Sequence, residues 1–411
     1  MFSKKQLIII SLILAMLFHF IFYFDLYGIQ TNIFSTLYKF ILAIVSSLLM
    51  IFIYFGTYWR VDLKQDSIRW LFDLLVAYIF ICFIRGLIKM HSLSDLKPFL
   101  FNSYAGLVLF PVLFFITGVN FKYFFPVNRI LTTYFFVVAF FSVFFINYVE
   151  LQHFLLLFIF YMILTIPLRS QWGRFGIILV SISVVIFSLS NRTEILRISI
   201  SYTILLAYYF LLNKKISRRI IYLMVFILLL VPAVSLYLGV QGQSIFKLMS
   251  GDETGTYSQM DPYADTRTFL YYEVFQDLKT NNAFLFGKGL DGGYYSPSFV
   301  TFDRLAVEVG FLQILLKTGI VGLILYITVI ILTIRKALIK SNNLFIKSMG
   351  LLLASYMIMI FIENIIAFNL LNIVIWFIIG MCNSQILREM NNKEIKNLLK
   401  NGKVEFQSPS Q

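Results

Sequence analysis

The chain has 411 residues, of which 60% are apolar and only 13% are charged, and its formal net charge is +14. Soluble domains carry about 25% charged residues, and 46 phenylalanines are more than one soluble core buries, so the composition excludes an ordinary soluble protein. The positive charge does not indicate nucleic-acid binding, because it lies mainly in short segments between apolar runs, where it orients a membrane protein.

Apolar runs recur along the whole chain, and each is long enough for a helix to cross a hydrocarbon layer of about 30 Å. The runs are continuous rather than alternating, which predicts helices and not barrel strands. The first run, which follows Lys4 and Lys5, is too long for a signal peptide and has no cleavage site after it. The fold class is therefore all-α, a polytopic membrane protein with about 12 transmembrane helices. The predicted spans are 6–24, 36–56, 68–88, 101–118, 130–146, 151–168, 174–190, 195–212, 220–238, 306–334, 346–362 and 367–387.

Basic residues gather in every second connection between these spans and at both ends of the chain. One such connection holds Lys214, Lys215, Arg218 and Arg219. Cytoplasmic connections are the ones enriched in Lys and Arg. The sequence thus predicts a multi-pass protein of the cytoplasmic (inner or plasma) membrane with both termini in the cytoplasm.

The chain divides into four parts. Residues 1–238 are predicted to form transmembrane helices 1–9, and 306–387 helices 10–12. Between them, 239–305 form a large extracytoplasmic loop, and 388–411 form a cytoplasmic tail. An insertion as long as this loop, in a protein of tight turns, is usually functional.

The middle of the large loop has the pattern of a short amphipathic helix. Asp265 is a suitable N-cap, and Tyr271, Phe275 and Leu278 recur at helical spacing. We expect this helix to lie on the membrane face or over a cavity.

Two arginines on the outer side are candidate site residues. Arg192, in the short loop before helix 8, lies on the side where arginine is disfavoured; alternatively it pairs with Glu194 or reaches the lipid headgroups. Arg267 lies near the start of the predicted loop helix, where its charge and the helix dipole together form an anion site. The alternative for Arg267 is a solvated surface arginine.

Ionisable residues also lie at the edge of helix 10. Glu308 and Lys317 are costly in or near a membrane and so are functional candidates, unless they pair with each other or with neighbours. Residues 287–292 spell G-x-G-x-x-G, but the strand and helix of a dinucleotide site are missing around them, so a tight glycine turn is predicted. The acids of the loop match no known cation-binding spacing, Cys82 and Cys382 lie inside apolar runs, and we predict no metal.

The order of these features resembles a known family. Along the chain, the features are an outer-loop arginine (Arg192), a large late loop with a second arginine (Arg267), the turn at 286–289 and the glycine-containing helix at 319–323. Across roughly residues 170–335 the chain resembles the Wzy-type O-antigen polymerases, which share a superfamily with the O-antigen ligases.

The resemblance implies a polysaccharide polymerase for capsule, exopolysaccharide or O-antigen. Such enzymes join oligosaccharide repeat units linked to undecaprenyl pyrophosphate on the outer face of the cytoplasmic membrane. A hydroxyl of the acceptor sugar attacks the anomeric carbon of the donor, and undecaprenyl pyrophosphate leaves. No cofactor, metal or nucleotide sugar is implied. The implied partners are the lipid-linked donor and acceptor and the bilayer, a flippase and a chain-length regulator are further candidates, and nucleic acid is not a partner.

The resemblance also assigns roles to residues. Arg192 and Arg267 match the family's outer arginines by position, and fixed guanidinium groups suit a pyrophosphate leaving group. Aromatic side chains of the loop either stack on sugars or serve packing, and the candidates are Tyr263, Tyr294 and Tyr295.

One feature departs from the ligases. Those enzymes carry a histidine just before the helix that follows the large loop, and it is a candidate base. None of the three histidines here lies near that position. Glu308, followed by Asp303, is the candidate catalytic base instead, and the missing histidine favours a polymerase over a ligase.

Two alternatives remain open at the sequence level. A ligase would transfer finished glycan to a different acceptor. A flippase or transporter of lipid-linked oligosaccharide would also suit twelve helices, but transporters usually show internal repeats with broken helices in matching halves, and the sequence shows no such symmetry.

Overall fold

The structure, a computed structural model, describes residues 68–89, 118–119, 121–144, 159–187, 192–210, 268–296, 303–361 and 370–401, together with residues 6, 9, 10, 13 and 234. Most of these residues are helical, as the sequence predicts. The helices are α3 (Ile68–Lys89), α6 (Phe121–Phe144), Ile159–Leu168 with its final turn η3 (Ile166–Leu168), α8 (Gln171–Phe187), α9 (Arg192–Phe210), α12 (Thr268–Thr280), α13 (Gly310–Ile339), α14 (Leu344–Met359), α15 (Leu370–Asn383), α16 (Gln385–Glu389) and α17 (Asn392–Asn401).

Three described stretches are long and apolar enough to cross a membrane. They are α3, the part of α6 from Tyr123 to Phe140, and α13. Five more apolar helices, among them α14 and α15, are shorter. Length and composition of the described helices are therefore compatible with the membrane protein that the sequence predicts.

Helix α13 lies at the centre of the main helical group and packs against α3, α14 and α15. Aromatic rings fill the contact between these helices. Trp376 of α15 is fully buried, and its ring lies 5.8 Å from that of Tyr326 on α13 and 6.1 Å from that of Phe72 on α3. Large rings in edge-to-face contact bury much apolar area, and this packing joins three helices that are far apart in sequence.

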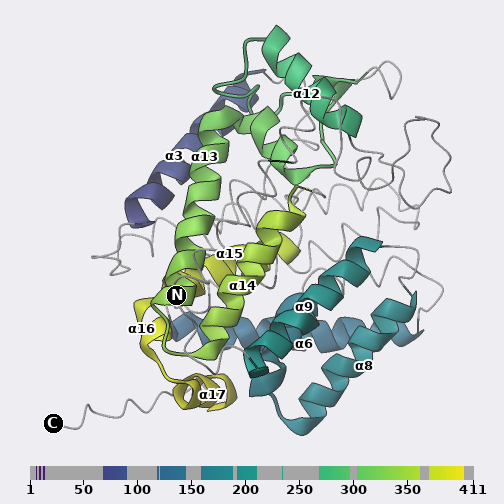
Figure 1. Cartoon of the computed structure of the whole chain (residues 1–411), viewed down its shortest axis with the longest axis vertical. Coiled ribbons are helices and arrows are strands. Elements are labelled where there is room, and N and C mark those ends of the chain that lie inside the picture. Colours follow the sequence, from purple (N-terminus) through teal and green to yellow (C-terminus); the bar gives the residue numbers. More distant parts are fainter. Residues whose placement is uncertain are drawn as a thin grey trace.

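The helical group has two distinct ends (Figure 1). At the α12 end lie α12 and a short antiparallel sheet, in which β1 (Tyr294–Tyr295) pairs with β2 (Asp303–Arg304). At the α17 end, Asn343, between α13 and α14, donates to the carbonyl oxygens of Leu387 and Met390, at 2.7 and 2.9 Å. Helix α17 also contacts α6 and η3. The α17 end thus collects the tail and connections that the charge pattern assigns to one side of the membrane.

Helix α13 is broken at Gly319, whose φ of 68° and ψ of −173° are not helical. The segment before the break, 310–318, is about 13 Å long, and the segment after it, 320–339, is about 30 Å long. The second segment alone therefore matches the thickness of a hydrocarbon layer. The helix begins and ends a few residues later than the predicted span 306–334.

The backbone groups released by the break find partners outside α13. The carbonyl oxygens of Leu316 and Lys317 accept from the N–H groups of Lys288 and Gly289, at 2.9 and 3.1 Å. The Tyr78 hydroxyl of α3 donates to the Thr318 carbonyl at 2.6 Å. Beyond the break, Ile320 N–H donates to the Phe284 carbonyl at 3.0 Å. An unpaired backbone group in apolar surroundings costs several kcal/mol, so residues 284–289 and Tyr78 complete the broken helix.

We predict that Gly319→Ala destabilises the fold. A Cβ at Gly319 would lie 2.3 Å from the Leu285 carbonyl oxygen, and the positive φ alone costs a residue with a side chain about 1–3 kcal/mol. The measurement is the fraction of a fluorescent fusion that remains monodisperse after solubilisation and stepwise heating.

The matched control is Gly173→Ala in α8, where the nearest atom to an added Cβ is 3.4 Å away and alanine favours the helix. Equal thermal stability of the Gly319 and Gly173 variants would contradict the role of the break.

Candidate functional site at the α12 end

Residues 283–293, here called the glycine turn, connect α12 to the sheet and lie against the break in α13. Gly287 and Gly289 have positive φ, 65° and 90°. A Cβ on Gly287 would lie 2.5 Å from the backbone nitrogen of Gly319 and from the Lys317 carbonyl oxygen. Glycine is required here by conformation and by close contact, so the G-x-G-x-x-G pattern forms the tight turn predicted from the sequence.

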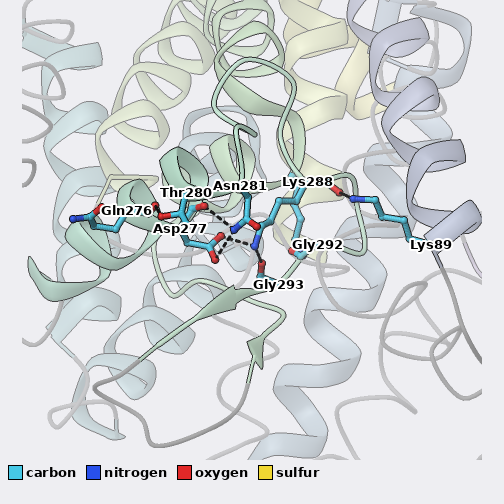
Figure 2. A network of polar contacts seen from close by, with 9 residues as sticks. Lys89, Gln276, Asp277, Thr280, Asn281, Lys288, Gly292 and Gly293 are labelled. Carbon is cyan, nitrogen blue, oxygen red and sulfur yellow. Dashed lines mark hydrogen bonds and ion pairs between the residues drawn. The ribbon is translucent and has the colours of Figure 1, made fainter.

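The C-terminal part of α3 holds the glycine turn through two cations. The Arg85 guanidinium donates to the carbonyl oxygens of Phe286 and Gly287, at 2.7 and 3.0 Å. Lys89 donates to the Lys288 carbonyl oxygen at 3.2 Å, as Figure 2 shows. These contacts join residues about 200 positions apart in the sequence. They fix the end of the large loop to a helix from the first part of the chain.

Lys288 ties the glycine turn to α12. Its ammonium group pairs with the Asp277 carboxylate at 2.5 Å and donates to the Gly293 carbonyl oxygen at 2.8 Å (Figure 2). The two charged side chains are only 18% and 10% exposed. Such a pair is screened less than one on the surface, and it holds α12 beside the turn.

Lys317, one of the ionisable candidates, is fully buried in α13 and donates to the Gly292 carbonyl oxygen at 2.6 Å. Glu308 lies before the first residue of α13, its side chain is 49% exposed, and it pairs with Arg304 at 3.2 Å. Lys317 and Glu308 thus each have a polar partner in the structure. Arg85, Lys89, Lys288 and Lys317 all contact backbone carbonyls, so we interpret them as residues that position the loop.

The two arginines expected to bind pyrophosphate are associated with helix N-termini. Arg192 is the first residue of α9. Arg267 and Tyr263 lie outside the described residues, but α12 begins at Thr268, directly after Arg267. A helix N-terminus carries partial positive charge and unpaired N–H groups, both of which favour an anion.

The N-terminal parts of α9 and α12 both lie toward the C-terminal end of α14. From α12, the Tyr271 hydroxyl donates to the Phe361 carbonyl oxygen at 2.9 Å. From α9, Arg197 lines a cavity of about 40 Å³ together with Met359 and Tyr356 of α14. The described N-terminal parts of these two helices therefore lie on the same side of the helical group.

The sheet carries the remaining candidate residues. Asp303 pairs in register with Tyr295, and Arg304 with Tyr294. Tyr294 is fully buried, and this burial raises the pKa of its hydroxyl, an effect that the Arg304 guanidinium partly opposes. Tyr295 is 55% exposed. Of these two tyrosines, only Tyr295 offers its ring to a ligand at the surface.

Sequence reasoning missed Arg197. This arginine belongs to an apolar stretch of α9 and is only 8% exposed. Apart from Arg197, its cavity is lined by Ser201, Ser355, Tyr356 and apolar side chains of α9, α14, α15 and the Ile159–Leu168 helix. A cation within an apolar segment was the available signal, because such residues are rare and costly in membranes.

Within the described ranges, no group of three or more His, Cys, Asp or Glu side chains is arranged to hold a metal ion. Comparison with protein-family models, with curated proteins and with solved structures gives no match. The functional argument therefore depends on the residues and their arrangement.

We predict that Lys288→Met loosens the glycine turn. The substitution removes the pair with Asp277 and the bond to Gly293, and we expect backbone amides of 286–293 to exchange hydrogen about tenfold faster, equivalent to about 1.4 kcal/mol of local opening. Hydrogen exchange with mass spectrometry measures this. Lys279→Met, which removes an exposed lysine of α12, is the control, and similar exchange in both variants would refute the role of Lys288.

Proposed function

We propose that this chain is a membrane glycosyltransferase that polymerises oligosaccharide repeat units linked to undecaprenyl pyrophosphate. The α12 end faces the outside of the cytoplasmic membrane and carries the reaction, and the product is a capsule, exopolysaccharide or O-antigen chain. The proposal combines the resemblance to Wzy-type polymerases with the arrangement of the described helices.

The observation that carries the proposal is that the N-terminal parts of α9 and α12 both lie toward the C-terminal end of α14. Helix α9 begins at Arg192 and α12 begins directly after Arg267. In the proposal, the guanidinium groups of Arg192 and Arg267 and these two helix N-termini supply charge-assisted donors for a pyrophosphate. Both arginines come from outer segments that the resemblance independently assigns to the donor pyrophosphate.

The proposed reaction is a displacement at the anomeric carbon of the donor. Glu308, before α13 and half exposed, accepts the proton of the acceptor hydroxyl. The hydroxyl oxygen forms the new glycosidic bond while the bond from the anomeric carbon to the pyrophosphate oxygen breaks, and undecaprenyl pyrophosphate leaves with the bonding electrons. Arg192 and Arg267 stabilise the negative charge that develops on the leaving group.

The glycine turn serves this reaction indirectly. It fixes the end of the large loop to α3 and α13, and the Lys288–Asp277 pair fixes α12 to the turn. Catalytic groups must be held to within a fraction of an ångström to be effective. In this proposal the carbonyl contacts of Arg85 and Lys317 position the loop, and Arg192 and Arg267 bind substrate.

We predict that Arg267→Ala stops chain extension while the protein still accumulates in the membrane. Loss of one fixed donor to a developing charge lowers rates about 10²–10³-fold, and Arg267→Lys recovers only part of the activity because lysine lacks the planar fork. The measurement is a gel of lipid-linked and surface glycans from a deletion strain that expresses each variant.

The control is Arg335→Ala, which removes an exposed arginine from the α13 segment that leads to the α17 end. A full ladder with wild type and Arg335→Ala, and a single repeat unit with Arg267→Ala, is the expected result. Long chains kept on the lipid carrier would indicate a ligase, absence of repeat units on the outer face would indicate a flippase, and polymer of normal length from Arg267→Ala would refute the donor site.

We predict that Glu308→Gln lowers polymerisation about 10²–10⁴-fold, the usual contribution of a general base, and that repeat units still reach the outer face. Arg304→Gln is the matched variant, because it breaks the pair at 3.2 Å and keeps the carboxylate. Equal loss in the two variants, in a quantitative polymer assay on membranes, would show that Glu308 acts only through its pair with Arg304.

A further inference from the structure

A hollow of about 400 Å³ follows one face of α6. Its described lining consists of Thr132, Thr133, Phe136, Val137 and Phe140. Their spacing of three and four residues places the five side chains on one helix face.

The lining changes from polar to apolar along the helix. Thr133, Val137 and Phe140 are exposed, at 46% for Val137 and 61% for Phe140. Arg129, also exposed, precedes Thr132 and Thr133 by three and four residues and so lies on the same face. From Arg129 to Phe140 the helix rises about 16 Å, which is about half the thickness of a hydrocarbon layer. A cation, two hydroxyls and an apolar stripe therefore span the depth of one leaflet.

A second arginine contacts the polar end of the hollow. Arg169, just after η3, donates to the side-chain oxygens of Thr132 at 2.8 Å, Thr165 at 3.1 Å and Asn128 at 3.4 Å. Within the part of the chain that the structure describes, all these acceptors are neutral. Burial lowers the pKa of Arg169, because desolvation disfavours the charged guanidinium.

At the start of α8, a further arginine is also bonded to neutral oxygens. Arg174 of α8 donates to the backbone carbonyls of Arg169 and Pro167, at 3.0 and 3.2 Å, and these acceptors are neutral as well. Trp172 is 85% exposed, as is typical of an aromatic residue at a membrane interface. Gly176 of α8 lies against Phe136, since a Cβ there would meet its ring at 3.0 Å. Helix α8 thus flanks the hollow beside the arginines.

We propose that this hollow binds one anionic phospholipid. The phosphate lies beside Arg129 and Arg169 at the threonine end, and one acyl chain follows Phe136, Val137 and Phe140. A net negative headgroup is favoured over a zwitterionic one, because Arg169 and Arg174 are paired with neutral oxygens and a zwitterionic lipid brings its own cation. The apolar stripe that continues from the cations favours a lipid over free phosphate. The site is independent of glycan polymerisation.

The test uses the full-length protein purified in detergent and exchanged into nanodiscs of equal parts phosphatidylglycerol and phosphatidylcholine. Native mass spectrometry after release counts the lipids that remain bound. We expect wild type to retain phosphatidylglycerol well above its share, and Arg129→Gln to lower this preference about fivefold, the usual contribution of one basic residue at a lipid surface. Arg129→Gln leaves the bonds of Arg169 intact, so the fold is kept.

One further variant tests the position of the acyl chain, and another serves as a control. Val137→Trp fills the hollow and should remove the retained lipid whichever headgroup it carries. Arg335→Gln, an exposed arginine elsewhere, should leave the preference unchanged. Retention of both lipids in proportion to the mixture, or no effect of Arg129→Gln and Val137→Trp, would overturn the proposal. Equal thermal stabilisation by inorganic phosphate and by phosphatidylglycerol would also overturn it, since it would indicate a simple anion site.

Discussion

The break in α13 is the constraint on which the rest of the described structure depends. At Gly319, a buried position in a long apolar helix, backbone hydrogen bonds are given up, and a buried backbone group without a partner is costly. Tyr78 of α3 and residues 284–289 provide the missing partners. The end of the large loop is therefore part of the helical group, and α3, α13 and the glycine turn form one unit.

This unit explains how the basic residues of the α12 end divide into two roles. Arg85, Lys89, Lys288 and Lys317 contact carbonyl oxygens of the turn or its neighbours, and charge-assisted hydrogen bonds of this kind are the stronger ones. They serve to hold a glycine-rich segment that has few side chains of its own to pack. The arginines associated with the starts of α9 and α12 are the ones proposed to bind the pyrophosphate.

The two ends of the protein then present different chemistry. At the α12 end, the loop is fixed, and the N-terminal parts of α9 and α12 lie toward the end of α14. Along α6 and beside η3, arginines contact neutral oxygens next to an apolar hollow, which suits a lipid headgroup rather than a reaction. A polymerase that handles lipid-linked glycans needs both properties in our proposal, a fixed anion site on one face and a defined position in the bilayer.

The sequence by itself determined the helical, apolar class of the chain and the tight turn at 287–292, because these follow from composition, hydropathy and glycine spacing, which are local. It pointed to Lys317 and Glu308 but not to their partners, which are Gly292 and Arg304. Only the tertiary structure decided the break at Gly319, the contact of Arg85 with a turn 201 residues away and the burial of Arg197. Those features arise when packed helices bring distant residues together and unpaired backbone groups must find partners, and a local pattern does not encode which partner that is.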